Sequence, residues 1–563
     1  MVRRFLWLLV LPVVAPHALA QPSPVCNVRN FGAVGDGATL DTGPISAAIA
    51  ACVKQGGGTV YVPPGRYVIG TVQLFSRIRL ELENGAVLVG SHDIRDYKAI
   101  SDFGFDKNYG TSSTGEGQHV GLLMTRNAED VTIEGGGEID GEGDSFMQLT
   151  TPHIGMDYDP SQVRDPEKFA AAMKRLDYGP FEPGDRPGTM IVFVHSANIQ
   201  IHGVTLHNSP NWTLHLQDVE GANISGIQIL NDPRVPNNDG IDCMICRNVR
   251  ISDCDIQTGD DDFAIVNSEH VNVSNCSLKS RSAAIRLEST KLSTFTGLSM
   301  DTNRGIGVFA SAHVTQPTED VLFSDIVMRT RLIPGHWWGK AEPIYIAVQP
   351  CAAGTACGVK VRNVVFNNIT AEAEGGSLLW GAEGSAISGV DLDGVRLHML
   401  APDPAFSESV GGNLDLRWTA PTPRDGIVNS EIPGIYAKHV EGLRLRDVRV
   451  NWGSSAPDYF SDGVKVEDFQ YVTIDGLAAK QAQTATGSAI FLSNGSGVSI
   501  TNSRALPGTR TFLHLEKVSG RRVFVNYDLS GAAVAIEPLS SRFDTEVGVP
   551  TVRRKVAGTS SKK

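Results

Sequence analysis

A repeated strand pattern constrains the fold of this chain more than any other feature. Short segments that alternate apolar and polar residues recur, and the first four begin at Asn198, Asn223, Asn248 and Val271. Their starts are 25, 25 and 23 residues apart, and weaker copies follow within residues 320–506. A period of two is typical of half-buried strands, and the Asn, Gly, Ser and Asp residues between units supply turns.

The connections between these units are too short for most other architectures. No helix-forming segment of ten or more residues separates most units, which excludes a fold of parallel strands joined by helical crossovers. A propeller needs four antiparallel strands in a repeat of about 40 residues. The pattern therefore predicts an all-β, single-stranded parallel β-helix, a solenoid whose coils of about 22–25 residues stack about 4.8 Å apart.

The ends and one interruption of the repeat need separate interpretation. A helix from Pro44 to Gln55, followed by Gly56, is expected to cap the open N-terminal end. Residues 144–187 break the repeat as an insertion, with a helix expected from Asp165, and should line a binding groove. We expect residues 21–545 to form one β-helix domain and residues 546–563 a flexible basic tail.

The first twenty residues resemble a secretory signal. Arg3 and Arg4 precede an apolar run at residues 5–14, and Ala18-Leu19-Ala20 is a cleavage site of the usual small-residue type. The apolar run is shorter than the roughly 20 residues that a membrane span needs. Cleavage after Ala20 and a secreted or periplasmic location are therefore predicted, with no membrane span.

Eight cysteines become available for disulfides in an exported protein. Cys26 with Cys52, and Cys351 with Cys357, could close loops, whereas Cys254 and Cys276 lie inside strand patterns and are better interpreted as buried thiols. The sequence does not determine the connectivity.

Charge and spacing exclude several kinds of ligand. No histidine pattern accompanies the cysteines at zinc-site spacing, so we predict neither a metal nor another cofactor. The 563-residue chain has a net charge of −13, which disfavours binding to nucleic acid. A monomer is expected.

Two acidic clusters lie on successive repeats. Asn237-Asn238-Asp239 begins the first, and Gly259-Asp260-Asp261-Asp262 forms the second. Asp239 and Asp260 are 21 residues apart, close to one coil, so stacking places them on neighbouring rungs. Acidic residues often only decorate turns or bind calcium. Crowded carboxylates, however, raise one another's pKa values, and glycoside hydrolysis needs one protonated and one ionised carboxyl group, about 6.5–9.5 Å apart in inverting enzymes.

Several motifs in this order resemble family 28 of the glycoside hydrolases, the polygalacturonase and rhamnogalacturonan hydrolase family of the pectin-lyase-like β-helices. They are FGAVGDGATLDTGPISAAI, GGGTVYVPPGRYVIG, GEIDGEG, HNSPNWTLH, NNDGID and TGDDDFAI. The resemblance implies a right-handed β-helix and inverting hydrolysis without a metal. It also implies that Asp260 is the general acid, that Asp239 and Asp261 activate the water, and that Asn237 contacts substrate.

Two family motifs are missing. Ser282-Ala283-Ala284 stands where the family has Gly-His-Gly, and Gly307-Val308-Phe309 stands where it has the Arg-Ile-Lys that binds the uronate carboxylate. Arg286 or Arg304 could replace that cation from a shifted position; each could equally be a solvated surface charge. We therefore expect plain polygalacturonan to be a poor substrate unless one of them does so, and a rhamnose-containing pectin to be preferred.

One loop offers further substrate contacts. Trp337 and Trp338 are adjacent on a polar, Gly-rich segment and could stack on sugar rings, although one could instead pack on the helix wall. Glu342 in the same loop could bind sugar hydroxyls. The sequence thus predicts a secreted hydrolase of a pectin-type or related acidic polysaccharide. A β-helix polysaccharide lyase and a non-catalytic carbohydrate-binding β-helix remain as alternatives.

Overall fold

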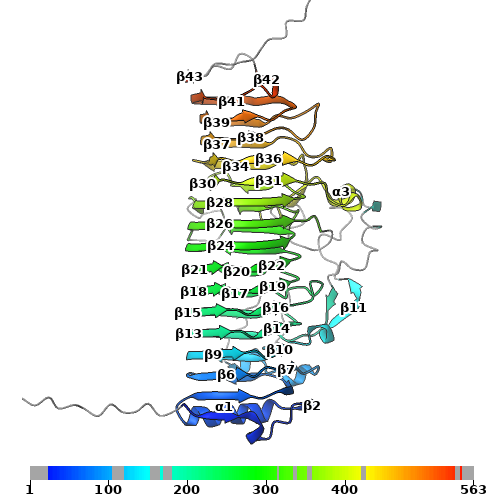
Figure 1. Ribbon diagram of the computed structural model, residues 1–563, viewed down its shortest axis with the longest axis vertical. Helices are drawn as coiled ribbons and strands as arrows, with labels where there is room; N and C mark the ends of the chain where they lie inside the picture. The colour runs from blue at the N-terminus through cyan, green and yellow to red at the C-terminus, as the bar shows by residue number, and fades with distance from the viewer. Residues whose placement is uncertain are drawn as a thin grey trace, which may run out of the picture.

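The protein is a parallel β-helix whose rungs stack along the long axis of the molecule (Figure 1). This computed structural model describes residues 23–103, 119–152, 165, 167, 168, 171, 181–312, 316–333, 339–351, 358–419, 426–538 and 545–547. One continuous sheet holds 39 strands of this part of the chain, so the predicted fold class is confirmed. No helix among the described residues is long and apolar enough to cross a membrane.

The sheet has three columns, and several long strands bend from one column into the next. The first column contains β5 (Val72–Leu74), β8 (Leu123–Arg126), β13 (Ile191–His202), β15 (Leu214–Ser225), β17 (Ile241–Met244), β20 (Phe263–Val266), β23 (Ala283–Glu288), β25 (Arg304–Ala310), β27 (Ile344–Val348), β29 (Ser377–Trp380), β34 (Ile435–Glu441), β37 (Val464–Asp475), β39 (Ile490–Thr501), β41 (Thr509–Val525) and β42 (Ala532–Glu537).

The other two columns are built in the same way. The second contains β1 (Val25–Asn27), β3 (Gly58–Val62), β6 (Ile78–Leu82), β9 (Glu129–Gly135), β18 (Arg247–Ser252), β21 (Glu269–Ser274), β24 (Lys291–Thr302), β26 (Thr318–Thr330), β28 (Val361–Ala373), β30 (Ile387–Asp393), β35 (Arg444–Arg446) and β43 (Thr545–Val547). The third contains β2 (Asp36–Leu40), β4 (Gly65–Ile69), β7 (Ala86–Gly90), β10 (Glu138–Asp140), β14 (Thr205–His207), β16 (Gln228–Leu230), β19 (Asp255–Thr258), β22 (Ser277–Ser280), β31 (Arg396–Met399), β36 (Arg449–Trp452), β38 (Ala478–Ala479) and β40 (Arg504–Ala505).

The inward positions of the repeat form the core. Ile201, Ile224, Ile251, Val273 and Phe295 follow one another in register and are fully buried. Further along this ladder, three phenylalanines stack with ring centroids 5.1 and 5.0 Å apart. Burial of like apolar side chains on successive rungs therefore fixes the register that aligns the outward-facing residues.

The polar residues between units turn the corners. At one corner, Gly203, Gly226, Asp253, Asn275 and Gly297 all adopt positive φ on successive rungs. Residues with short polar side chains and glycine tolerate this conformation best. The Asn275 amide also donates a hydrogen bond to the Asp253 carboxylate of the rung before, at 2.5 Å. The turn composition seen in the sequence is thus a consequence of the corner geometry.

The repeat alignment itself needs one correction. Asn223, taken as the start of the second unit, lies opposite Arg250 and not opposite Asn248. The second unit therefore begins two residues earlier, because the αL corner at Asn248 is filled on that coil by Gly221.

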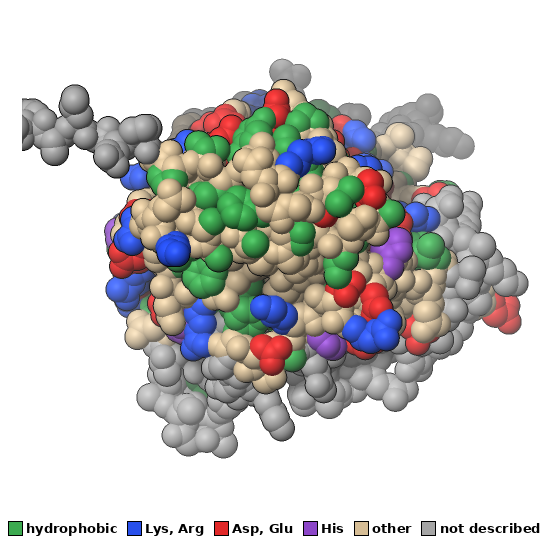
Figure 2. Space-filling model, turned by 90° about the horizontal axis from the view of Figure 1, so that it is seen from below, with side chains coloured by type: hydrophobic (Ala, Val, Ile, Leu, Met, Phe, Trp, Pro, Cys, Tyr) green, Lys and Arg blue, Asp and Glu red, His purple; other side chains and the backbone are tan. Residues whose placement is uncertain are grey.

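The N-terminal end is capped as predicted. Helix α1 (Thr42–Lys54) lies across the first rungs, with Pro44 in its first turn (Figure 1). A disulfide joins Cys26 of β1 to Cys52 of α1. Seen from this end in Figure 2, hydrophobic side chains are dispersed among polar and charged ones, as a capped solenoid end requires. Cys254 and Cys276 are buried free thiols, as predicted.

Two antiparallel strand pairs lie outside the helical sheet. β11 (Met147–Pro152) pairs with β12 (Phe181–Pro183), and β32 (Asn413–Asp415) pairs with β33 (Ile427–Asn429). Among the described residues the structure also contains helix α3 (Pro404–Val410) and the short 3₁₀ turns η1 (Val28–Phe31), η2 (Ile94–Asp96), η3 (Ile100–Phe103) and η4 (Gly143–Phe146).

Several sequence predictions concern segments outside the described residues. These are the signal segment, Trp337 and Trp338, Cys357, most of the helix predicted from Asp165, and the basic tail.

Candidate active site

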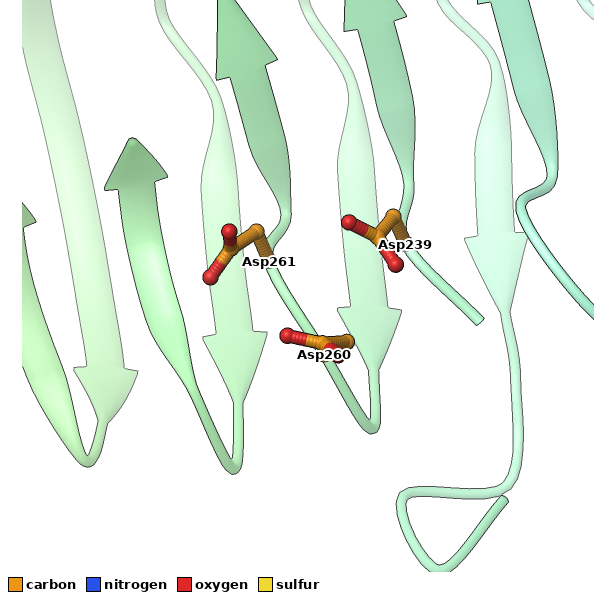
Figure 3. Close-up of side chains that lie close together, drawn as sticks. All are labelled: Asp239, Asp260 and Asp261. Atoms are coloured by element: carbon orange, nitrogen blue, oxygen red, sulfur yellow. The ribbon is translucent and has the colours of Figure 1, made fainter. Parts of the chain in front are cut away.

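The first column of the sheet places Asp239 and Asp261 at equivalent positions of adjacent rungs. Ile241 of β17 lies opposite Phe263 of β20, so the residues two positions earlier, Asp239 and Asp261, are stacked. The Gly240 amide donates a hydrogen bond to the Asp261 carbonyl at 2.9 Å, which ties the two rungs together just before the strands begin. Asp260 precedes Asp261 on the same turn (Figure 3).

These three residues, here called the aspartate triad, converge. One carboxylate oxygen from each lies within 4.8 Å of the others. Asp239 and Asp261 are buried, and Asp260 is partly exposed. The roughly 6.5–9.5 Å expected of an inverting pair is a separation between whole carboxyl groups. The convergence of one oxygen from each residue does not measure that separation, so inversion stays a prediction.

Buried polar groups hold the loop that carries Asp239. The Arg186 guanidinium, which is 2% exposed, donates to the carbonyls of Pro210 and Pro236 at 2.7 Å and to Asn237 Oδ1 at 3.0 Å. The Asn237 amide in turn faces Asp260 Oδ2 at 3.4 Å. Arg186 lies at the end of the 144–187 insertion, so the insertion contributes to the site.

A second anchor fixes the turn at Asp260. The Gly259 amide donates to Asn238 Oδ1 at 2.5 Å, and a Cβ at Gly259 would lie 2.4 Å from the Val235 carbonyl. Thr258 Oγ1 donates to the Asp260 carbonyl at 2.5 Å. The glycine is therefore required by close backbone approach, which agrees with the bend predicted at this residue.

The three carboxyl groups differ in how readily they ionise. Asp261 Oδ1 accepts hydrogen bonds from Ser282 Oγ at 3.0 Å and from the Ala283 amide at 3.1 Å, and Arg286 lies 4.0 Å from its other oxygen. Burial still raises the pKa of Asp261, but these three contacts oppose the rise. Asp261 is therefore the best candidate for the ionised member.

Asp260 and Asp239 have fewer contacts that oppose the rise of their pKa values. Burial, and then the charge of Asp261, raise the pKa of Asp260 to about 7. Burial followed by the charges of Asp260 and Asp242 raises the pKa of Asp239 well above its usual value. Asp239 Oδ1 has no hydrogen-bond partner among the described residues. At neutral pH the cluster thus holds at least one proton beside an ionised carboxylate.

Arg286 faces the triad from the next rung. Ile285 and Leu287 are buried while Arg286 is partly exposed, as the strand alternation predicted. Its guanidinium carbon lies 5.5 Å from the ring centre of Phe309 and 5.6 Å from that of Trp418. A Cβ at Gly307 would lie 2.6 Å from the Phe309 ring, so glycine there lets this ring fold back over the sheet.

The structure places Arg304 and Glu342 differently from the expectation that they contact substrate. The Arg304 side chain is only 1% exposed; it donates to Glu342 at 3.3 Å and to Asp415 at 2.8 Å. Arg417 also donates to both oxygens of Asp415, at 2.9 and 2.8 Å. These four residues form what we call the Arg304 cluster. Their charges neutralise one another inside the protein, so Arg304 is not a free cation for a substrate.

Sequence reasoning missed three residues around the triad. Trp418 and Arg186 reach the site from segments without strand periodicity, so no repeat pattern indicated them. His215 lies opposite Asp242 in register on the rung before, and burial lowers its pKa to about 4, so the ring is neutral. The motif HNSPNWTLH contained His215, and its alternation within a strand was the available signal. Asp242 and Asp262 are fully buried.

Comparisons with known proteins agree with this site. Residues 179–281, which include the triad, match the model of glycosyl hydrolases family 28, and residues 25–119 match a model described as rhamnogalacturonase A/epimerase, pectate lyase-like. A probable polygalacturonase of Vitis vinifera is 33% identical over 46% of this chain and 47% of its own length. One from Arabidopsis thaliana is 27% identical over 43% of each chain.

The matches to these curated relatives span about half of their length. Among solved structures, the hyperthermoactive exopolygalacturonase from Thermotoga maritima aligns with a TM-score of 0.54 at 18% identity, covering 77% of this chain and 93% of that one. This similarity supports the right-handed parallel β-helix. Residues 179–281, with the triad inside them, are thus similar to family 28 of the glycosyl hydrolases, and the solved structure shares the parallel β-helix fold.

Proposed function

We propose that the protein is a glycoside hydrolase that cleaves O-glycosidic bonds in a pectin-type or related acidic polysaccharide. The observation that carries this proposal is the triad itself, in which a carboxyl group with a pKa of about 7 lies beside a more readily ionised one. Two titratable groups whose environments separate their pKa values are the acid and base that glycoside hydrolysis needs.

The proposed roles follow from these environments. Asp260, which with a pKa of about 7 is still partly protonated at neutral pH and is partly exposed, donates its proton to the leaving glycosidic oxygen as the C1–O bond breaks. Asp261, together with Asp239, orients a water molecule, takes its proton and directs the oxygen to C1. Asn237 orients Asp260 through its amide. Inversion at C1 is part of the proposal through the family resemblance, and the anomeric products test it directly.

Arg286 is the cation available for a uronate carboxylate. It is partly exposed, adjoins Asp261, and lies beside the edge-to-face pair of Phe309 and Trp418. Trp418, beside Arg286, is the aromatic side chain that the described residues offer for packing against a sugar ring. Stacking on Trp337 and Trp338, which lie outside the described residues, remains a prediction. Preference for rhamnose-containing pectin over polygalacturonan remains a prediction.

Export is part of the same proposal. The disulfide between Cys26 and Cys52 is of a kind that persists in oxidising compartments outside the cytosol. A secreted protein would also meet a polymeric substrate that cannot enter a cell.

Asp260→Asn provides the test. We expect turnover of pectin-derived oligosaccharides to fall by about 10²–10⁴-fold, because general acid catalysis contributes about that much. Asp255→Asn, at an exposed position on the same coil, should be unaffected. The products of the wild type are read by mass and by anomeric NMR. Near-normal activity of Asp260→Asn would contradict the assignment.

The same products separate hydrolysis from lyase chemistry. Three oxygens within 4.8 Å of one another could also hold a divalent cation, which prefers carboxylate ligands. Unsaturated products, together with loss of activity in a chelator, would favour a lyase. Binding of oligosaccharides without any product would favour a non-catalytic role.

A further inference from the structure

Three arginines form a row on the third column of the sheet, away from the triad. Arg396 of β31 lies opposite Arg449 of β36, Arg449 lies opposite Ala478 of β38, and Ala478 lies opposite Arg504 of β40. These strands lie on successive rungs in the upper half of the molecule (Figure 1). The three side chains line a hollow of about 470 Å³. Since Ala478 is short, the row has a gap on its third rung.

The three arginines of this row differ from several other exposed arginines, which form ion pairs with carboxylates on neighbouring rungs. Arg329 pairs with Glu372, Arg362 with Glu319, and Arg446 with Asp393, each across rungs. None of the three arginines of the row has an ion pair within 4.0 Å to any carboxylate in the part of the chain that the structure describes. Each is exposed. In a chain with a net charge of −13, three cations in one line without a close ion pair are unexpected, although the charge of Arg504 does lower the pKa of Asp528 on the next rung.

The arrangement is also unfavourable without a ligand. Like charges directly opposite on paired strands destabilise a sheet, and Arg396 and Arg449 are such a pair. Arg396 uses one nitrogen on Asn368 and on the Gly394 carbonyl, at 3.5 and 3.3 Å, which leaves the rest of its guanidinium directed elsewhere. An anion lying along the row would turn this repulsion into binding energy.

The other residues that line the hollow indicate which kind of anion it would bind. Asp447, Asp475 and Asn502 also line it. Carboxylates repel a densely charged phosphate backbone but accept hydrogen bonds from hydroxyl groups. A uronate polymer supplies both a carboxylate for the arginines and hydroxyls for these acceptors. Its extended chain also suits a row that follows the long axis of the solenoid.

We propose that this row, Arg396, Arg449 and Arg504, is an accessory binding site for a strand of carboxylate-bearing polysaccharide. It is separate from the catalytic site. Strand β19 ends two residues before Asp260. Counted along the third column, β31 lies five rungs beyond β19, and each rung adds about 4.8 Å. The site would hold one part of a long polymer while another part is cleaved.

Binding can be measured without catalysis. The full chain carrying Asp260→Asn is titrated with long, unesterified polygalacturonate, and Arg449→Ala and the triple variant Arg396→Ala/Arg449→Ala/Arg504→Ala are compared in that background. We expect the single variant to bind about two- to fivefold more weakly, as for one exposed charge pair, and the triple variant about tenfold more weakly or beyond. Added salt should weaken binding of the parent and matter less for the triple variant.

Arg446→Ala is the matched control. It removes the same charge from the end of β35, three residues before Arg449, but Arg446 is paired with Asp393. It should bind polygalacturonate like the parent. Equal weakening by Arg446→Ala and by Arg449→Ala would overturn the site. Duplex DNA in the same assay tests the occupant: loss of DNA binding with unchanged polygalacturonate binding in the triple variant would overturn it as well. Unchanged cleavage of short oligosaccharides by the triple variant in an active background would support it.

Discussion

Two clusters of charged side chains lie on the same column of the sheet and have opposite character. Register places Asp239, Asp261, Ala283 and Arg304 on successive rungs, so the triad and the Arg304 cluster are separated by one alanine. The triad brings three carboxylates together, with the charges of Arg286 and Arg304 lowering the pKa of Asp261. The Arg304 cluster alternates two guanidiniums with two carboxylates, and Arg304 also lies 3.7 Å from the ring centre of Tyr345.

The comparison shows what decides the behaviour of a buried carboxyl group. Burial raises the pKa in both places, but in the Arg304 cluster the arginines overcome it and hold the pKa of Asp415 far below its usual value. In the triad burial and like charge act together, and the pKa of Asp260 rises to about 7. The Arg304 cluster therefore stabilises the loop that carries Trp418. The aspartate triad, in contrast, keeps a carboxyl group protonated near neutral pH, as acid catalysis requires.

The largest effect is expected from breaking the compensated cluster. Asp415→Ala leaves Arg304 and Arg417 facing each other in the interior with one carboxylate fewer. We expect the midpoint of thermal unfolding to fall by the equivalent of about 3–5 kcal/mol, because a buried pair that loses one partner leaves an uncompensated charge. Asp393→Ala, which breaks the exposed pair with Arg446, should cost less than about 1 kcal/mol. Equal losses would contradict the contrast drawn between the clusters.

For the triad we expect a smaller change in stability, and of opposite sign: Asp260→Asn should stabilise the protein. The pKa of Asp260 is about 7 in the folded protein against an ordinary value of 3.8, so neutral pH favours the unfolded state, in which the group ionises freely. Asp260→Asn removes this penalty. It should raise stability by about 1–2 kcal/mol at pH 7, and the gain should shrink as the pH falls towards 4 and vanish well below the ordinary value of 3.8, where the wild-type group is protonated in both states.

Thermal midpoints of wild type and Asp260→Asn between pH 4 and pH 8 measure this gain. A midpoint of Asp260→Asn below that of the wild type at pH 7 would contradict it. The lowered pKa of Asp415 has the opposite linkage: its stabilisation is present above the ordinary value and is lost only as the pH falls well below it. The two clusters should therefore respond to acid with opposite signs.

The parts of this molecule that follow the repeat could be predicted from sequence. The period of two fixed which face of each strand is buried, so the stacking of Asp239 near Asp260 and the outward direction of Arg286 followed. The cap, expected from Pro44 to Gln55, was likewise a local signal, and the structure contains it as Thr42–Lys54. The sequence left the disulfide connectivity open, and the structure joins Cys26 to Cys52.

The rest depended on contacts across long separations in sequence. Arg304 pairs with Asp415, which is 111 residues away and lies in the β32–β33 excursion outside the repeat. No periodic pattern links such segments, so Arg304 was expected at the surface as a substrate ligand. Trp418 follows Arg417 in the same excursion, so no repeat pattern indicated it either. Carboxyl spacing was also out of reach, since it depends on the turn at Gly259 and on which way each side chain points.

The smallest predicted effect tests Arg286, the cation that lies 4.0 Å from Asp261. The positive charge of Arg286 lowers the pKa of Asp260, opposing burial. If Asp260 is the general acid, activity declines as the pH rises through about 7, where this group loses its proton. Removing the charge with Arg286→Gln should keep Asp260 protonated to higher pH and move the alkaline limb of kcat/KM upward by a fraction of a pH unit. Arg286→Lys keeps the charge and should leave the limb in place.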